Sequence, residues 1–259
     1  MSDHILIERD GALATVVLNR PEKLNALTKP MWRALGEAIE ALSADDTLRC
    51  IILRGAGGKS FSPGNDISEF ETERSNPAQA KAYGEVLHHT LKVLKECRQP
   101  TVALIEGICV GGGLEIAALC DIRICGESSR FGVPINRLGL VMAYPEIAGL
   151  RQLVGRAVTL EILLEGRVFG AAEAKEKGLV NRVVPDDRVE AEALNTARRI
   201  AGGAPLVARW HKMFLRRLED PAPLAEAELD EGYACYGTKD FQIGYRAFLD
   251  KKTPEFEGR

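Results

Sequence analysis

The order of hydrophobic and polar residues predicts a β-hairpin followed by an amphipathic helix. Residues 5–8 and 14–18 are two apolar, strand-like segments joined by Asp10-Gly11, a dipeptide typical of hairpin turns. Residues 28–43 then carry apolar side chains at helical spacing, and Thr28 is well suited to cap the helix.

Short apolar strands and helices alternate up to about residue 132. Strands are expected at 50–53, 101–105 and 122–125, and helices at 77–97 and 114–120. The glycine-dense segment 107–113 is expected to form a turn. Strands that alternate with helices in this way indicate an α/β fold with a parallel or mixed sheet.

The pattern after residue 140 is mainly helical. We expect one clear strand there, at 179–184, and helices at 146–153, 157–165, 171–177, 187–202, 205–218, 222–236 and 238–249. The sequence contains no internal repeat and no composition shift that separates independent domains. We therefore predict a β/α core over residues 1–200 and a helical C-terminal region over residues 201–259.

Composition and charge exclude several classes of protein. The 259 residues include 34 basic and 37 acidic side chains, and the net charge of −3 gives no reason to expect a nucleic-acid partner. No apolar run approaches the roughly 20 residues that span a bilayer, and the first residues lack the layout of a leader sequence. The six cysteines lack zinc-site spacing, so we expect reduced thiols, no bound metal and a cytoplasmic location.

Two further motifs are weak candidates for ligand sites. Residues 55–60 resemble the end of a phosphate-binding P-loop, but its leading glycine would fall at Leu53, inside a predicted strand. His88 and His89 lie within a predicted helix, where only Glu85 stands four residues from His89. We therefore expect neither a nucleotide site nor a metal site at these positions.

Two glycine-containing segments could expose backbone N–H groups. Residues 107–116 run from a strand through three consecutive glycines into a helix, and Pro63-Gly64 forces a turn that could expose the N–H of Asn65. A helix N-terminus adds a partial positive charge. Two N–H groups that face one point would form an oxyanion hole.

Glu115 lies one turn into the helix that follows the three glycines. Its apolar neighbours would raise the pKa of the carboxyl group, whereas the helix N-terminus would lower it. Glu115 is therefore either a general acid or base, or an ordinary first-turn glutamate that interacts with the helix dipole.

Taken in order, these segments resemble the crotonase family, also called the enoyl-CoA hydratase/isomerase superfamily, over nearly the whole chain. The resemblance rests on residues 19–27, 61–67, 107–115, 120–123, 131–139, 171–180 and 248–256. It implies an α/β fold with a crotonase-like ββα spiral core and a helical C-terminal region that packs trimers, which often pair into hexamers.

The resemblance also implies a substrate and a site. The substrate is an acyl-CoA thioester, whose enolate is stabilised by the N–H groups of Asn65 and Gly112, with Glu115 as the catalytic carboxyl group. Contacts to the substrate or to its CoA portion are implied for Lys23, Leu24, Ala26, Ser62, Gly64, Asp66, Ile67, Gly111, Pro134, Ile135, Leu138, Phe248 and Lys251. Coenzyme A arrives as part of the substrate, so no resident cofactor is expected.

The sequence departs from this family at one catalytic position. Active hydratases of the family use two glutamates with one water between them, and Ile135 stands at the second position. An isoleucine cannot transfer a proton. The nominal activity is enoyl-CoA hydratase, but three alternatives stay open: replacement of the missing group by Tyr144 or Glu146, isomerisation or other enolate chemistry with Glu115 alone, and acyl-CoA binding without catalysis.

Overall fold

Two β-sheets form the centre of the computed structural model, which describes residues 4–259. The expectation that the chain lacks a leader sequence includes residues 1–3, which lie outside the described residues. The strands are β1 (Ile5–Asp10), β2 (Leu13–Leu18), β3 (Cys50–Gly55), β4 (Ser60–Ser62), β5 (Thr101–Ile105), β6 (Ile108–Val110), β7 (Ile122–Gly126), β8 (Arg130–Gly132), β9 (Phe169–Gly170) and β10 (Arg182–Val184).

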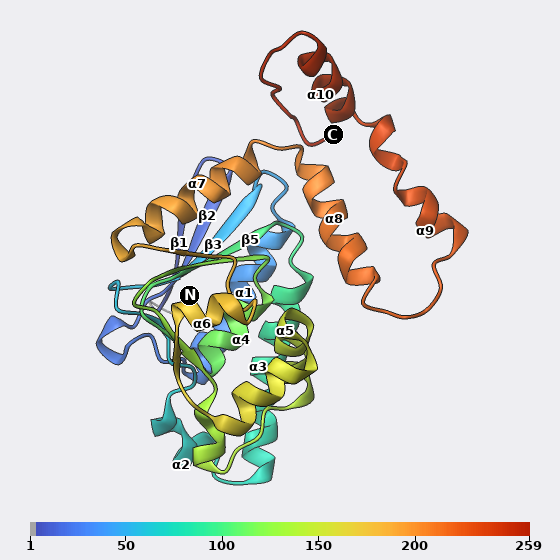
Figure 1. Cartoon of the computed structure of the whole chain (residues 1–259). Helices are drawn as coiled ribbons and strands as arrows, with labels where there is room; N and C mark the ends of the chain where they lie inside the picture. Colours follow the sequence, from blue (N-terminus) through green and yellow to red (C-terminus); the bar gives the residue numbers. More distant parts are fainter. Residues whose placement is uncertain (1–3) are drawn as a thin grey trace.

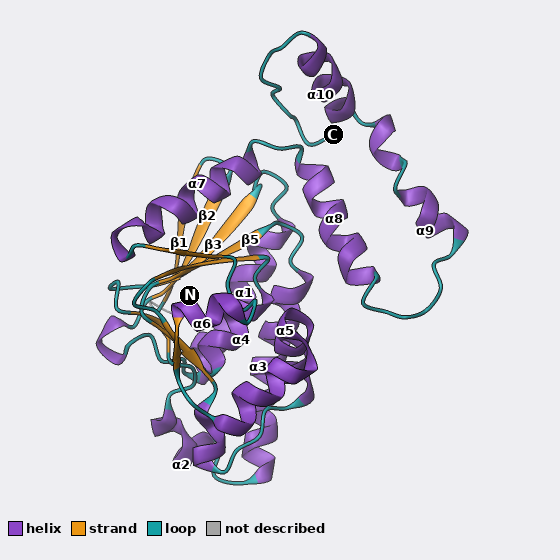
Figure 2. Ribbon diagram, in the orientation of Figure 1, coloured by secondary structure: helices purple, strands orange, loops and turns teal. Residues whose placement is uncertain are grey.

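Helices surround the sheets and form the whole C-terminal part (Figures 1 and 2). They are α1 (Lys29–Ala44), α2 (Phe70–Glu73), α3 (Pro77–Glu96), α4 (Gly112–Leu119), α5 (Tyr144–Glu165), α6 (Ala171–Glu176), α7 (Val189–Ala201), α8 (Pro205–Arg217), α9 (Glu226–Glu231) and α10 (Lys239–Leu249). Short 3₁₀ helices include η3 (Pro134–Leu138) and η5 (Ala234–Gly237).

From β3 to β8, successive strands alternate between the two sheets. The larger sheet has the order β1-β2-β3-β5-β7-β10, and the smaller has the order β4-β6-β8-β9. The pairs β1/β2 and β8/β9 are antiparallel, and the other neighbours are parallel. The pairs β3-β4, β5-β6 and β7-β8 each contribute one strand to each sheet, and helices follow each pair, so a ββα unit recurs without a sequence repeat.

The central strands of the larger sheet are buried on both faces. Ile52 of β3 packs with Val189 and Ala193 on one face, where α7 lies across the strands (Figure 1). Ile51, the preceding residue, belongs to the main core on the other face, together with residues of α1 and α3. This alternation follows from the two-residue period of a strand, and it fixes the sheet between two helical layers.

Most elements with local signals form where they are predicted. The hairpin turns at Gly11, whose φ is +56°, and the side chain of Thr28 accepts a hydrogen bond from the N–H of Met31. The two helices expected at 146–153 and 157–165 are the two halves of α5, which are separated by a kink at Gly155, where φ is +74° and ψ is 172°.

Residues 107–113, expected as a glycine-dense turn and as the end of a strand that runs into a helix, contain strand β6 and the turn into α4. Residues 55–60, where no P-loop was expected, lead into strand β4, whereas a P-loop leads into a helix.

Other predictions are wrong in detail. The helix predicted at 222–236 is shorter and divides into α9 and η5. Strand β9 was not predicted, and of residues 179–184 only the last three form a strand.

The C-terminal helices extend from the core as an arm. Helix α8 lies beside the core, whereas α9 and α10 stand away from it (Figure 1). Two ion pairs attach α8: Arg209 Nη1 lies 2.9 Å from Asp46 Oδ1, and Lys212 Nζ lies 2.7 Å from Asp121 Oδ2. The division of the chain near residue 200 stays a prediction. Within residues 4–259, no helix is long and apolar enough to cross a membrane.

Candidate functional site

The two glycine-containing segments meet at one end of the core. Gly64, with φ +95°, lies so close to α4 that a Cβ atom there would come within 2.6 Å of the Gly112 nitrogen. Gly111, with φ +53°, turns the chain from β6 into α4. The absence of side chains at these glycines therefore allows the two backbones to approach each other.

Two backbone N–H groups lie beside a cavity of about 130 Å³, which is lined in part by Asn65, Gly111 and Gly112. In the bridge between Leu27 and Asn65, Leu27 N–H donates to Gly64 O and Asp66 N–H donates to Leu27 O, both at 2.8 Å. Neither bond uses the N–H of Asn65. Gly112 is the first residue of α4, where an N–H has no acceptor within the helix. Both groups are suited to hydrogen-bond an anionic oxygen.

The side chain of Asn65 is held by aromatic residues that the sequence analysis missed. The indole Nε1–H of Trp32 donates to Asn65 Oδ1 at 2.7 Å, and Tyr83 Oη lies 3.5 Å from the same oxygen. Trp32 and Tyr83 are buried. No local signal in the sequence showed that the polar atoms of Trp32 and Tyr83 orient Asn65.

Glu115 is a buried carboxyl group at the cavity wall. Glu115 as a whole is 9% exposed. Its Oε2 atom is buried and has no hydrogen-bond partner within residues 4–259. Burial raises the pKa of Glu115 to about 8, repulsion by Glu146 contributes in the same direction, and Arg74 opposes both. A carboxyl group with this pKa holds its proton at neutral pH and can donate it.

Glu146 is the second carboxyl group at the same cavity. His88 Nε2 lies 2.9 Å from Glu146 Oε1, and the N–H of Ala143 donates to Glu146 Oε2 at 2.8 Å. Each oxygen of Glu146 thus has one polar partner, His88 on α3 or the backbone of Ala143. Tyr144, the other candidate replacement, is 92% exposed and does not line this cavity.

The rest of the cavity wall is mainly apolar. Ile135, at the position where the family has its second glutamate, lines the cavity beside Leu138, Val141 and Met142. These residues come from η3 and the loop that leads to α5. The wall suits an acyl chain, with Arg74 as a charged exception.

The predicted substrate-contact residues fall into three groups. Ile67, Gly111, Pro134, Ile135 and Leu138 line the cavity together with the predicted oxyanion residues and Glu115. Ser62, Gly64 and Asp66 lie in the adjoining loop, and Lys23, Leu24 and Ala26 lie in the segment packed against that loop. Phe248 and Lys251 lie on or just after α10, far from the cavity within one chain (Figure 1).

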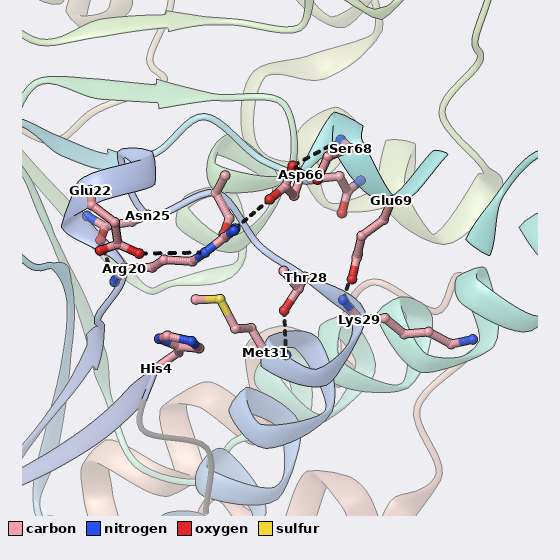
Figure 3. A network of polar contacts seen from close by, with 12 residues as sticks. His4, Arg20, Glu22, Asn25, Thr28, Lys29, Met31, Asp66, Ser68 and Glu69 are labelled. Carbon is pink, nitrogen blue, oxygen red and sulfur yellow. Dashed lines mark hydrogen bonds and ion pairs between the residues drawn. The ribbon is translucent and has the colours of Figure 1, made fainter. Parts of the chain in front are cut away.

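The loop that carries Asn65 is held by a polar network (Figure 3). Arg20 donates through Nη1 to Asp66 Oδ2 at 2.6 Å and to the carbonyl oxygen of Ala26 at 3.2 Å. The bond from Arg20 to Asp66 and the bonds from Ser68 lower the pKa of Asp66 to about 2. Ser62 Oγ donates to the carbonyl oxygen of Asn25 and accepts from the N–H of Gly64. The side chains of Ser62 and Asp66 are therefore engaged in the loop itself.

The two histidines singled out in the sequence have different surroundings. His89 pairs with Glu40 at 3.2 Å on the surface, whereas His88 reaches the cavity residue Glu146. No group of three or more potential metal ligands occurs in the described part of the chain. The contact of His88 connects α3 to α5, so it has no signal in the local sequence.

The two-sheet ββα architecture and the apolar cavity at the N-terminus of α4 define the crotonase class of α/β proteins. The family model for enoyl-CoA hydratase/isomerase matches residues 8–259. A probable enoyl-CoA hydratase of Mycobacterium tuberculosis is 34% identical over 258 residues, with 98% of each chain covered. The short-chain-enoyl-CoA hydratase of Clostridium acetobutylicum is 31% identical over 255 residues, with 98% of this chain and 97% of that protein covered.

Solved structures agree with this assignment. A structure from Magnetospirillum magneticum, described as an enoyl-CoA hydratase/carnithine racemase, is 55% identical to this chain. It superposes with a TM-score of 0.98 and covers 100% of this chain and 97% of its own. The chain therefore belongs to the enoyl-CoA hydratase/isomerase family.

Proposed function

We propose that this protein hydrates a 2-enoyl-CoA thioester, with Glu115 and Glu146 as its two proton-transfer groups. The observation that carries the proposal is that both carboxyl groups line one cavity beside Asn65 and Gly112. Glu146 thereby supplies the carboxyl group that Ile135 lacks. Relatives named enoyl-CoA hydratase, at 30–34% identity, support the same reaction.

The proposed mechanism assigns opposite roles to the two carboxyl groups. The N–H groups of Asn65 and Gly112 donate to the thioester oxygen and stabilise the enolate as negative charge develops there. Glu146, ionised, accepts a proton from water while the water oxygen bonds to C3 of the substrate. Glu115, protonated because of its burial, delivers its proton to C2. The C2=C3 bond thus gains one water, and proton exchange with solvent resets both carboxyl groups.

Chemistry with one carboxyl group is the second candidate. It is favoured by Ile135 and by the engagement of both Glu146 oxygens in hydrogen bonds. In this case Glu115 would move a proton between carbons of the substrate, as in a double-bond isomerase. A role in acyl-CoA binding without catalysis would need neither carboxyl group.

One experiment separates these functions. The purified protein is incubated in D₂O with crotonyl-CoA and with longer and branched 2-enoyl-CoA thioesters. Loss of the enoyl absorbance, with one deuterium at C2 and a hydroxyl group at C3, is the expected result. Deuterium exchange or double-bond migration without addition of water would favour the single-carboxylate function. Thioester binding without either signal would contradict both enzymatic functions.

We also infer that the chain assembles as a homotrimer, or as a hexamer of two trimers, through its C-terminal arm. The arm exposes Leu215, Leu218 and Leu229 by 57–68% and Phe248 by 83%. Burying such side chains against other copies is favourable. In such an assembly, Phe248 and Lys251 would reach the CoA of a neighbouring subunit. Light scattering should give three or six times the chain mass of 28.3 kDa, and a monomer would contradict this inference.

The remaining inferences concern location and cofactors. We infer a cytoplasmic enzyme whose six cysteines are reduced, since none forms a disulfide within residues 4–259 and five are buried. We propose no resident cofactor or metal, because the proton transfers described above need only the two carboxyl groups and the backbone N–H groups. Activity that survives treatment with a chelator is the expected result.

A further inference from the structure

A half-buried guanidinium group forms part of the cavity wall, which otherwise consists of apolar residues, Asn65 and the two carboxyl groups of Glu115 and Glu146. Arg74 follows α2 and lines the cavity together with Phe70. Its Cζ atom lies 4.7 Å from the ring centroid of Phe70 and 4.8 Å from that of Tyr83. Contact with two aromatic rings restrains the planar group while leaving N–H donors at its edge.

The acidic residues near Arg74 have other partners. Glu69 Oε2 accepts hydrogen bonds from Tyr83 Oη at 3.0 Å and from the backbone N–H of Lys29 at 2.9 Å. Glu73 pairs with the Lys29 ammonium group at 2.9 Å. Among residues 4–259, no side chain forms an ion pair or hydrogen bond with the guanidinium of Arg74.

Glu115 does not neutralise Arg74 by direct contact. The two side chains influence each other electrostatically, but Glu115 Oε2 has no hydrogen-bond partner. A guanidinium group presents up to five donors and binds a carboxylate through two parallel hydrogen bonds. The cavity therefore holds a cation whose donors remain available for an anionic ligand.

We propose that Arg74 binds a carboxylate group on the acyl portion of the substrate. The substrate class is then the mono-CoA thioester of an unsaturated dicarboxylic acid, rather than a simple fatty enoyl-CoA. The inference rests on the proposed function for the CoA thioester itself. The same guanidinium would disfavour an acyl chain with a cationic group, because like charges would meet in a cavity with limited solvation.

The anion could come from the acyl chain or from the phosphates of CoA, so the test separates these sources. Calorimetry measures the binding of glutaryl-CoA, a saturated thioester with a terminal carboxylate, and of its methyl ester. Both ligands carry the same phosphates, and the ester replaces the terminal negative charge with a neutral methyl ester. We expect the protein to bind glutaryl-CoA about tenfold or more tightly than the ester.

Three variants test whether Arg74 causes the preference for glutaryl-CoA over its methyl ester. Arg74→Met should bring the affinity ratio of the two ligands close to one, and Arg74→Lys should leave an intermediate ratio because it keeps the charge but not the planar fork. Arg151→Met removes an exposed arginine of α5 that does not line the cavity, and it should keep the ratio of the unmodified protein. Circular dichroism checks that each variant is folded.

Two results would overturn the proposal. One is equal affinity of the unmodified protein for the two ligands, or a preference that survives in Arg74→Met. The other is an equal loss of affinity for both ligands in Arg74→Met, which would assign Arg74 to the CoA phosphates. Because these ligands are saturated, the test does not require hydration. A carboxylate preference without hydration of glutaconyl-CoA or crotonyl-CoA would contradict the proposed function alone.

Discussion

His88 Nε2 lies 2.9 Å from Glu146 Oε1, although 58 residues separate the two side chains in the sequence. His88 projects from the middle of α3, and Glu146 lies in the first turn of α5. The second oxygen of Glu146 accepts from the N–H of Ala143. The carboxylate is thus held from two sides at the cavity, which is the arrangement needed to position a base for a water molecule.

Replacement of this base tests its role. Glu146→Gln keeps the size of the side chain but removes the proton acceptor, so we expect hydration to slow by about 10²-fold or more. The control is Glu127→Gln, which changes an exposed glutamate outside the cavity lining. Stopped-flow or steady-state absorbance of crotonyl-CoA measures the rate. Full activity of Glu146→Gln would show that another group activates water.

Replacement of the acid tests the other half of the mechanism. Glu115→Gln should lower turnover by about 10²-fold or more, because an amide cannot deliver a proton to carbon. Thioester binding, measured by calorimetry, should change much less. Unchanged turnover with a substrate that the unmodified protein hydrates would falsify the assignment of Glu115.

The raised pKa of Glu115 predicts two effects of pH. Its protonated form is the proposed acid, so turnover should fall as pH rises through about 8. The folded state retains this proton above the ordinary pKa of 4.5, whereas the unfolded chain loses it. This contribution to the free energy of unfolding is therefore complete below pH 4.5 and is lost as pH rises through about 8.

Glu115→Gln is also the control for the pH effects. Denaturant titrations between pH 5 and 9 should show a smaller decline in stability with pH for this variant than for the unmodified protein. Identical slopes would mean that the carboxyl group of Glu115 is not buried in solution.

The backbone N–H of Gly112 can be tested with two substitutions. Gly112→Pro removes the N–H at the first position of α4, where proline is compatible with a helix. Loss of one oxyanion donor should lower kcat by about 10²–10³-fold. Gly112→Ala is the matched control, because it retains the N–H and adds a Cβ that approaches Trp32 to 3.0 Å. Equal activity of the proline and alanine variants would argue against this donor.

The close approach at Gly64 predicts a large effect of one methyl group. Gly64→Ala would place its Cβ 2.6 Å from the Gly112 nitrogen at a φ of +95°. We expect the variant to lose about 1–3 kcal/mol of stability and to lose activity, because the loop must move. Gly237→Ala, which meets open space, serves as the control in thermal unfolding. Similar melting temperatures for the two variants would contradict the close contact.

The ββα repetition was implied by the family resemblance but has no counterpart in the residue pattern. Strands β4, β6 and β8 contain three residues each, and every one is stabilised by neighbours remote in sequence. A segment of three residues is too short to show the alternation of apolar and polar residues by which a strand is recognised. The smaller sheet therefore could not be predicted from local sequence.

The sequence by itself determined the locally encoded features of this protein. Hairpin, caps and helices depend on turn residues and periodicity within a few positions, as Thr28 and its helix illustrate. The glycines next to Asn65 and Gly112 could be recognised from the local sequence as turn positions, although the contact between Gly64 and Gly112 depends on the fold. Glu115 could be recognised as a candidate because its position after three glycines is itself a local feature.

Only the tertiary structure decided which side chains share the cavity. Sequence alone left Tyr144 and Glu146 as equal candidates, and the first turn of α5 directs Glu146 to the cavity while Tyr144 faces solvent. The contacts of Glu146 with His88 and of Arg74 with Tyr83 join elements that are separate along the chain. Packing of the whole core sets such contacts, so no short stretch of residues contains the information that specifies them.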